Sequence, residues 1–112
     1  MNARREVVLW IAQRMTAVIL AVCVVVHLVT IIYAVRGGLG AAEILGRTRG
    51  SYLWAAFYGT FVIATAIHAS IGLRSVAAEW LAFKGRTGDG AMALIAVALA
   101  ILGMRAVWAV FA

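Results

Sequence analysis

The stretch Ile67-His68-Ala69-Ser70-Ile71-Gly72-Leu73-Arg74 decides how this chain must fold. It closes an apolar run that begins at Tyr52, and it places a histidine inside that run and an arginine at its end. Ionisable side chains are costly at bilayer depth, and those found there usually carry function. If the run spans a membrane, the imidazole of His68 is therefore the first candidate for a functional group.

Beyond this stretch, the whole chain has the composition of an integral membrane protein. Of its 112 residues, 66% are hydrophobic and 12% are charged, whereas soluble domains are about 45–50% apolar. A soluble domain of this length could not bury so much apolar surface. We expect one membrane-anchor domain, residues 1–112, with no separate soluble module.

Three apolar runs are long enough to cross a bilayer, which takes roughly 20 residues. Lipid offers the backbone no hydrogen-bond partners and the chain has no proline, so each run is expected to be a helix. The connections between them are short, which favours an up-down-up bundle. The predicted fold is an all-α membrane protein with three transmembrane helices at residues 15–35, 52–73 (continuing to about 83) and 91–112.

The segments that flank the runs carry further predictions. Residues 7–11 are apolar between charged residues, which predicts a short interfacial N-terminal helix with Trp10 at headgroup level. Asp89 is a candidate N-cap for the third helix. The first run is longer than the core of a signal peptide, so we expect it to be retained as a helix.

The net charge of +6 indicates a membrane surface rather than nucleic acid, because almost all basic residues flank apolar runs. The N-terminal segment and the second connection hold Arg4, Arg5, Arg14, Arg74, Lys84 and Arg86, and the first connection holds Arg36, Arg47 and Arg49. Basic residues are enriched on the cytoplasmic side. This bias predicts a bacterial-type inner-membrane protein with a cytoplasmic N-terminus.

His68 has neighbours that suit an axial ligand of a b-type haem. Gly72 lies one turn later on nearly the same face, where a missing side chain leaves room for a flat macrocycle. Arg74 stands at the membrane edge, where a guanidinium could pair with a haem propionate. The alternative is that His68 hydrogen-bonds to a neighbouring helix, as polar residues in membrane bundles do.

Cys23 is the only cysteine, which narrows the choice of cofactor. A single thiol excludes an internal disulfide, a C-x-x-C-H attachment site for c-type haem and a cysteine-ligated iron–sulfur cluster within the chain. Any haem would be held by ligation and packing.

His27 lies on the first helix, and its predicted depth differs from that of His68 by roughly 10 Å. Axial ligands of one iron lie about 4 Å apart, since each metal–nitrogen bond is near 2 Å. Two histidines that bind haem would therefore bind different haems, each completed by another chain. Arg105 would then balance a propionate of the outer haem. The alternatives are a hydrogen-bonding role for His27 and snorkelling of Arg105 to the surface.

Polar and aromatic residues are expected to gather at the inner interface, where they could hold a quinone. A quinone headgroup needs donors at its carbonyl oxygens, and Arg14, Gln13 and Trp80 could supply them. The alternative is an ordinary belt of tryptophan and arginine at a membrane surface. The candidate residues are Trp10, Gln13, Arg14, Glu79 and Trp80.

Two motifs resemble the membrane-anchor cytochrome b subunits of succinate dehydrogenase and fumarate reductase (respiratory complex II). Gln13-Arg14-Met15-Thr16-Ala17 opens helix one, and His68-Ala69-Ser70-Ile71-Gly72-Leu73-Arg74 closes helix two. The length and the three-helix layout are similar too, so the likeness covers nearly the whole chain.

The resemblance implies a set of roles. His68 would bind haem b, and Arg14 would lie near the quinone pocket and the haem propionates. The chain would dock a flavoprotein subunit and an iron–sulfur subunit and pair with a second anchor chain or a copy of itself. Electrons would pass from the iron–sulfur clusters to quinone, and the chain would not itself oxidise succinate. The spacing of His27 and His68 is similar to that of the two-haem branch of the family.

Where relatives carry a tyrosine and a serine near the quinone, this chain has Trp80 and Trp10, so these contacts would be rearranged. Two other interpretations use the same residues. The chain could be a haem-free structural or assembly subunit of another membrane complex, with both histidines bonding between helices. It could also be the haem-b anchor of a different quinone-linked dehydrogenase.

Overall fold

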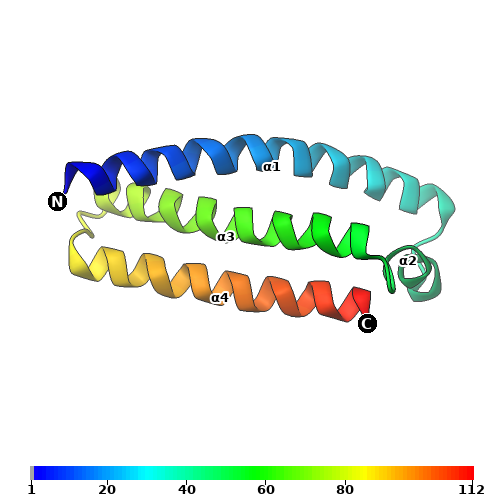
Figure 1. The fold of residues 1–112 in the computed structure, drawn as a ribbon. Helices are drawn as coiled ribbons and strands as arrows, with labels where there is room; N and C mark the ends of the chain where they lie inside the picture. Colours follow the sequence, from blue (N-terminus) through cyan, green and yellow to red (C-terminus); the bar gives the residue numbers. More distant parts are fainter. Residues whose placement is uncertain (1) are drawn as a thin grey trace.

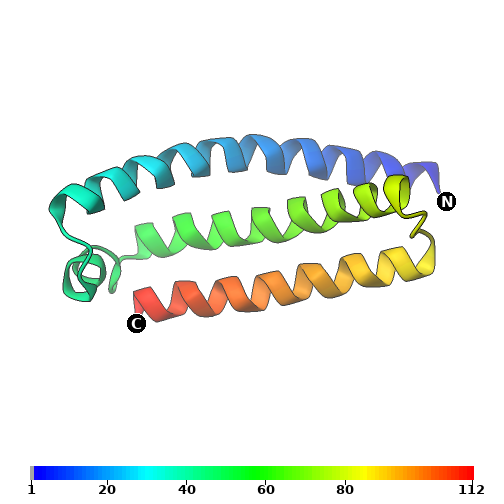
Figure 2. The same ribbon diagram turned by 180° about the vertical axis from the view of Figure 1, so that it is seen from behind.

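The computed structural model describes residues 2–112, and nearly all of them are helical. The elements are α1 (Ala3–Gly37), α2 (Ala41–Thr48), α3 (Tyr52–Trp80) and α4 (Arg86–Phe111). The three long helices lie side by side in a bundle that measures 50 × 24 × 22 Å, with α3 between α1 and α4 (Figures 1 and 2). All three are long and apolar enough to cross a bilayer. The chain is a multi-pass membrane protein.

Neighbouring helices run antiparallel. Rising residue numbers on α1 meet falling numbers on α3, as at the pairs Gln13–Gly72 and His27–Tyr58. Figure 1 shows α4 turning back beside α3, with the two ends of the chain at opposite ends of the bundle. The side of the membrane that each end faces stays a prediction.

One narrow stripe of α1 faces α3. Its less exposed residues recur every three or four positions, which is the period of a single helix face. The remaining positions carry exposed valines, leucines and isoleucines that would meet lipid. Most of the polar side chains of α1 at bilayer depth therefore face protein. The stripe consists of Arg5, Leu9, Ala12, Thr16, Leu20, Cys23, His27, Thr30 and Ala34.

Small residues allow the helices to approach one another. A Cβ at Gly103 of α4 would overlap the side chain of Val62 on α3. Ala64, Ala66 and Ser70 of α3 are buried. Membrane helices depend on such packing, because lipid tails are as apolar as the helices and supply little hydrophobic drive between them.

Three boundaries differ from the expectation. Residues 7–11 are helical, but they continue without a break into α1 and form no separate interfacial helix, because no glycine or proline intervenes. α3 ends at Trp80 and not near 83, since Ala82 adopts a φ of 54° and a left-handed residue ends a helix. α4 begins at Arg86 with Gly85 at its N-cap, so Asp89 is not the cap and lies in the first turn.

The connection between α1 and α3 contains the short helix α2, which was not predicted from the sequence. The Thr48 hydroxyl donates to the Val110 carbonyl at 2.8 Å, and the Gly50 N–H donates to the Phe111 carbonyl at 2.8 Å. α2 is therefore fixed against the end of α4. These contacts join distant parts of the chain, so no local sequence pattern predicts them.

Candidate functional site

His68 faces α1 and makes a hydrogen bond with Thr16. Its Nδ1 lies 3.2 Å from Thr16 Oγ1. The threonine hydroxyl has a single hydrogen, and this is committed to the helix backbone, with the Ala12 carbonyl at 2.7 Å and the Gln13 carbonyl at 3.1 Å. Toward His68 the hydroxyl can only accept. This arrangement favours the tautomer of His68 that carries its hydrogen on Nδ1.

This tautomer leaves the lone pair of His68 on Nε2. Within residues 2–112, Nε2 makes no hydrogen bond. A ligating histidine commonly has one nitrogen held by a neighbouring acceptor while the other faces the metal. The same range contains no group of three or more histidine, cysteine, aspartate or glutamate side chains that could hold a bare metal ion.

Gln13 lies over Gly72, one turn after His68. A Cβ at Gly72 would come within 3.3 Å of Gln13 Nε2, so the glycine accommodates this carboxamide. Gln13 Oε1 is buried and has no hydrogen-bond partner in the part of the chain that the structure describes. An orphaned buried acceptor costs about 1–3 kcal/mol. A ligand that offers it a donor, or that displaces the side chain, would relieve this cost.

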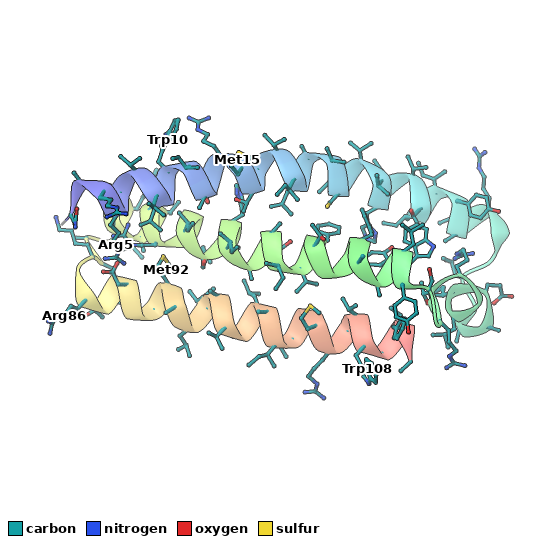
Figure 3. The ribbon with its side chains drawn as sticks, viewed as in Figure 1. Arg5, Trp10, Met15, Arg86, Met92 and Trp108 are labelled. Atoms are coloured by element: carbon teal, nitrogen blue, oxygen red, sulfur yellow. The ribbon has the colours of Figure 1, made fainter. Side chains whose placement is uncertain are left out.

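At the adjoining end of the bundle, Arg74 belongs to an ion-pair cluster. Its Nε donates to Asp89 Oδ1 at 2.8 Å, Arg5 Nη1 donates to Asp89 Oδ2 at 2.7 Å, and Glu6 lies 3.6 Å from Arg74 Nη2. The cluster joins α1, α3 and α4, and Figure 3 shows Arg5 pointing into the bundle. Arg74 was predicted to meet a propionate. A propionate here would share the guanidinium with these carboxylates.

The predicted quinone residues fall into separate groups. Arg14 packs over the ring of Trp10, 5.3 Å from its centroid, and Figure 3 shows Trp10 pointing away from α3. Gln13 faces the opposite way, toward α3. Glu79 and Trp80 are exposed at the end of α3. These side chains lie at one end of the bundle without converging on one pocket, so a quinone site here would need surface from another chain.

A groove of about 480 Å³ opens beside the Thr16–His68 pair. Thr16 and Ile19 of α1 form one wall, and Ala64 and Ile67 of α3 form another. The groove runs along α3 from Ala56 to Ile67, and His68 itself is not among the residues that line it. Small and apolar walls suit a flat hydrophobic ligand.

His27 lies among aromatic rings near the other end of the bundle. Its Nδ1 is 3.4 Å from the Tyr58 hydroxyl, and its ring meets Tyr58 and Phe61 edge-on, with centroids 5.7 and 5.6 Å apart. It lines a cavity of about 600 Å³. Tyr58 precedes His68 on α3 by ten residues, roughly 15 Å along the axis. Within this chain the two imidazoles therefore cannot ligate one iron, as the depth estimate had indicated.

Arg105 does not share the cavity of His27. The cavity is lined on α4 by Leu102, Gly103, Ala106 and Val107, whereas Arg105 is exposed on another face of that helix. The structure does not bring the guanidinium and the imidazole together. The position of Arg105 agrees with the alternative, in which its side chain reaches toward the surface.

Three residues contribute to these sites without having been assigned such roles from the sequence. Thr16 belongs to the helix-one motif, but nothing local shows that its hydroxyl meets an imidazole 52 positions later. Asp89 is the shared anion of two arginines. Tyr58 is the partner of His27. For all three, the missing information was which residues face one another across helices.

Comparison with known proteins agrees with this architecture. The family model for the succinate dehydrogenase/fumarate reductase transmembrane subunit matches residues 1–107. No curated protein and no solved structure matches the chain significantly. The matched range includes both histidines, the ion-pair cluster and most of α4. The chain therefore belongs to the family of transmembrane subunits of succinate dehydrogenase and fumarate reductase.

Proposed function

We propose that this chain is a haem-b-binding membrane anchor of a succinate:quinone oxidoreductase, with His68 as an axial ligand. The observation that carries the proposal is the contact of His68 Nδ1 with Thr16 Oγ1, a hydroxyl whose hydrogen bonds to the helix backbone, because this contact favours the tautomer with a lone pair on Nε2. Membership of the family supports the setting. The chain would dock the flavoprotein and iron–sulfur subunits and would not itself oxidise succinate.

The residues around His68 suit a haem. Imidazole is a common axial ligand of haem iron. Ala64 and Gly72 lie one turn to either side of His68 and present little bulk. Gln13 would have to move to free the face of Gly72, and its orphaned Oε1 means that little is lost when it does. Arg74 would hold a propionate. Bound there, the haem would supply a one-electron carrier within the membrane.

The second axial ligand would come from another chain, because His27 lies roughly 15 Å away along the bundle. This implies a partner anchor or a second copy of this chain. A second haem at His27 would find an imidazole and a cavity of about 600 Å³, but no arginine or lysine among the lining residues. A propionate needs a cation or several donors when buried. We therefore propose one haem at the His68 site.

The quinone is the substrate at the same end of the bundle. Gln13, Arg14 and Trp80 would donate to its carbonyl oxygens, with Trp10 and Glu79 alongside, once a partner surface brings them together. The basic residues at this end favour the cytoplasmic side of an inner membrane. The iron–sulfur subunit would then dock where electrons can reach the quinone directly.

The test is the composition of the intact complex, purified with a tag on this chain. Reduced-minus-oxidised spectra and pyridine haem analysis should show b-type haem, together with a flavoprotein and an iron–sulfur subunit in equal amounts. A colourless complex that retains those subunits would contradict the haem assignment and leave a plain anchor. A different dehydrogenase as the stoichiometric partner would contradict the assignment to succinate oxidation or fumarate reduction.

A further inference from the structure

We infer that Thr16 is a positioning residue for His68. Its hydroxyl oxygen holds Nδ1–H, directs Nε2 away from α1 and strengthens the imidazole as a donor to iron. This rests on the proposed function, in which His68 ligates haem. Thr16 itself would touch neither the haem nor the quinone.

The geometry around Thr16 is restrictive. The residue is 6% exposed and is among the most buried on α1. Its hydroxyl bonds back to the Ala12 carbonyl at 2.7 Å, a bond that fixes the side-chain rotamer and consumes the only hydrogen. The lone pairs are thereby directed toward α3, where the only ring nitrogen within hydrogen-bond distance is His68 Nδ1, at 3.2 Å.

Other threonines of the spanning helices show that a hydroxyl bond to the backbone does not by itself bring the side chain to a histidine. Thr30, on the same stripe of α1, donates to the Val26 carbonyl at 2.8 Å, and Thr65 on α3 donates to the Phe61 carbonyl at 2.7 Å. Within residues 2–112, neither hydroxyl makes a hydrogen bond with a histidine. Ser70, close to His68 in sequence, donates to the Ile67 carbonyl at 3.0 Å. Thr16 thus combines a common backbone bond with a specific contact.

The chemistry follows from the direction of this bond. An acceptor at Nδ1–H moves electron density toward Nε2 and makes it a better ligand, and loss of such a partner typically costs 10–100-fold in metal affinity. Hydrogen bonding around the axial ligand also tunes the reduction potential of haem. A better donor stabilises ferric iron more than ferrous iron. Removal of the Thr16 hydroxyl should therefore raise the midpoint potential.

The experiment compares Thr16→Val, Thr16→Ser and Thr30→Val in the intact complex. Readouts are the rate of haem loss to an excess of apomyoglobin, the midpoint potential from a spectroscopic redox titration, and the electron paramagnetic resonance spectrum of the ferric haem. We expect Thr16→Val to lose haem roughly tenfold faster and to titrate at a more positive potential. Thr16→Ser and Thr30→Val should resemble the wild type.

An unchanged potential and haem-loss rate in Thr16→Val would overturn the inference, as would an equal shift in Thr30→Val. A serine variant that behaves like the valine variant would also overturn it. Should Thr16→Val fail to assemble, Thr16→Cys supplies a weaker acceptor of similar size, and the same shifts in smaller amount are expected. A wild-type complex without haem would contradict the proposed function itself, whereas these outcomes contradict only the role of Thr16.

Discussion

His68 and His27 both project from spanning helices onto the α1–α3 interface, and each contacts a hydroxyl group. The two hydroxyl groups differ in whether their own hydrogen is already used in another hydrogen bond. The Thr16 hydrogen is committed to the backbone, so Thr16 accepts from His68. The Tyr58 hydroxyl contacts His27 Nδ1 at 3.4 Å and has no other partner within the described range. Tyr58 is therefore able to donate, which would place the His27 proton on Nε2 and block ligation there.

The charged residues near the two histidines also differ. Arg74 and Arg5 form their ion pairs with Asp89 beyond the His68 site. The cation near His27 is instead Arg47 of α2, which acts on Tyr58 but does not line the cavity. Residue type and depth alone thus do not distinguish the two histidines as ligands. In the proposed function, the hydrogen of the neighbouring hydroxyl distinguishes the two sites.

Replacing each histidine in turn gives the largest expected effect. His68→Ala should remove the proposed haem completely, because no other side chain at that depth carries a ligand nitrogen with a free lone pair. His27→Ala should leave this haem in place. Pyridine haem analysis of the two purified complexes checks the contrast. Equal haem loss in both variants would abolish the distinction between the two sites.

Gln13→Leu should separate stability from function. In the isolated chain in detergent, removal of the orphaned Oε1 should raise the free energy of unfolding by about 1 kcal/mol, because a buried acceptor without a donor carries a desolvation penalty. In the assembled complex the same change should slow quinone reduction, since a donor is lost. Chemical denaturation followed by circular dichroism measures the first effect, and a destabilised chain would contradict this account of Gln13.

Tyr58→Phe should have a small effect. It removes the 3.4 Å hydrogen bond to His27 but keeps the edge-on ring contact, and hydrogen bonds between membrane helices average about 0.6 kcal/mol. The haem content should stay at the wild-type level, in contrast to the effect of Thr16→Val on haem retention. Unfolding in detergent together with the haem assay checks both points. A haem lost with the Tyr58 hydroxyl would mean that His27 is a ligand after all.

Arg105→Gln should change least. The side chain is exposed and lies away from the cavity of His27, so haem content and midpoint potential should match the wild type. A redox titration of the variant complex provides the check. A shifted potential would show that Arg105 balances a nearby propionate, and it would revive the outer haem.

The sequence predicts the parts of this structure that depend on local chemistry. Apolar length and the absence of proline predict three helices, and the depth estimate correctly separates the two histidines. The sequence does not predict which residues face one another across two helices. Helical periodicity shows which residues share a stripe, but not that Thr16 meets His68 or that Arg74 meets Asp89, because rotation and axial offset are set by packing between helices.

The residues at which the helices begin and end also divide into those that the sequence predicts and those that it does not. The sequence could have predicted that α1 continues through residues 7–11, because a helix that satisfies its own backbone hydrogen bonds need not end in the headgroup region. The early end of α3 depends on the conformation of Ala82, a residue with no intrinsic preference for it. No assignment for the connection around residues 37–50 came from the sequence, and the contacts of Thr48 and Gly50 with the end of α4 support a helix there.

The stripe on α1 makes the chain sensitive to insertion in a way that hydropathy does not detect. One alanine added between Thr16 and Cys23 would leave a perfectly good transmembrane segment, but at 3.6 residues per turn it would rotate everything after it by about 100°. Thr16 would still face its imidazole while His27 and Thr30 turned toward lipid. A bilayer tolerates such a change, but the contacts of His27 with Tyr58 and Phe61 would be lost, so the rotational phase of α1 constrains this chain as strictly as its hydrophobicity does.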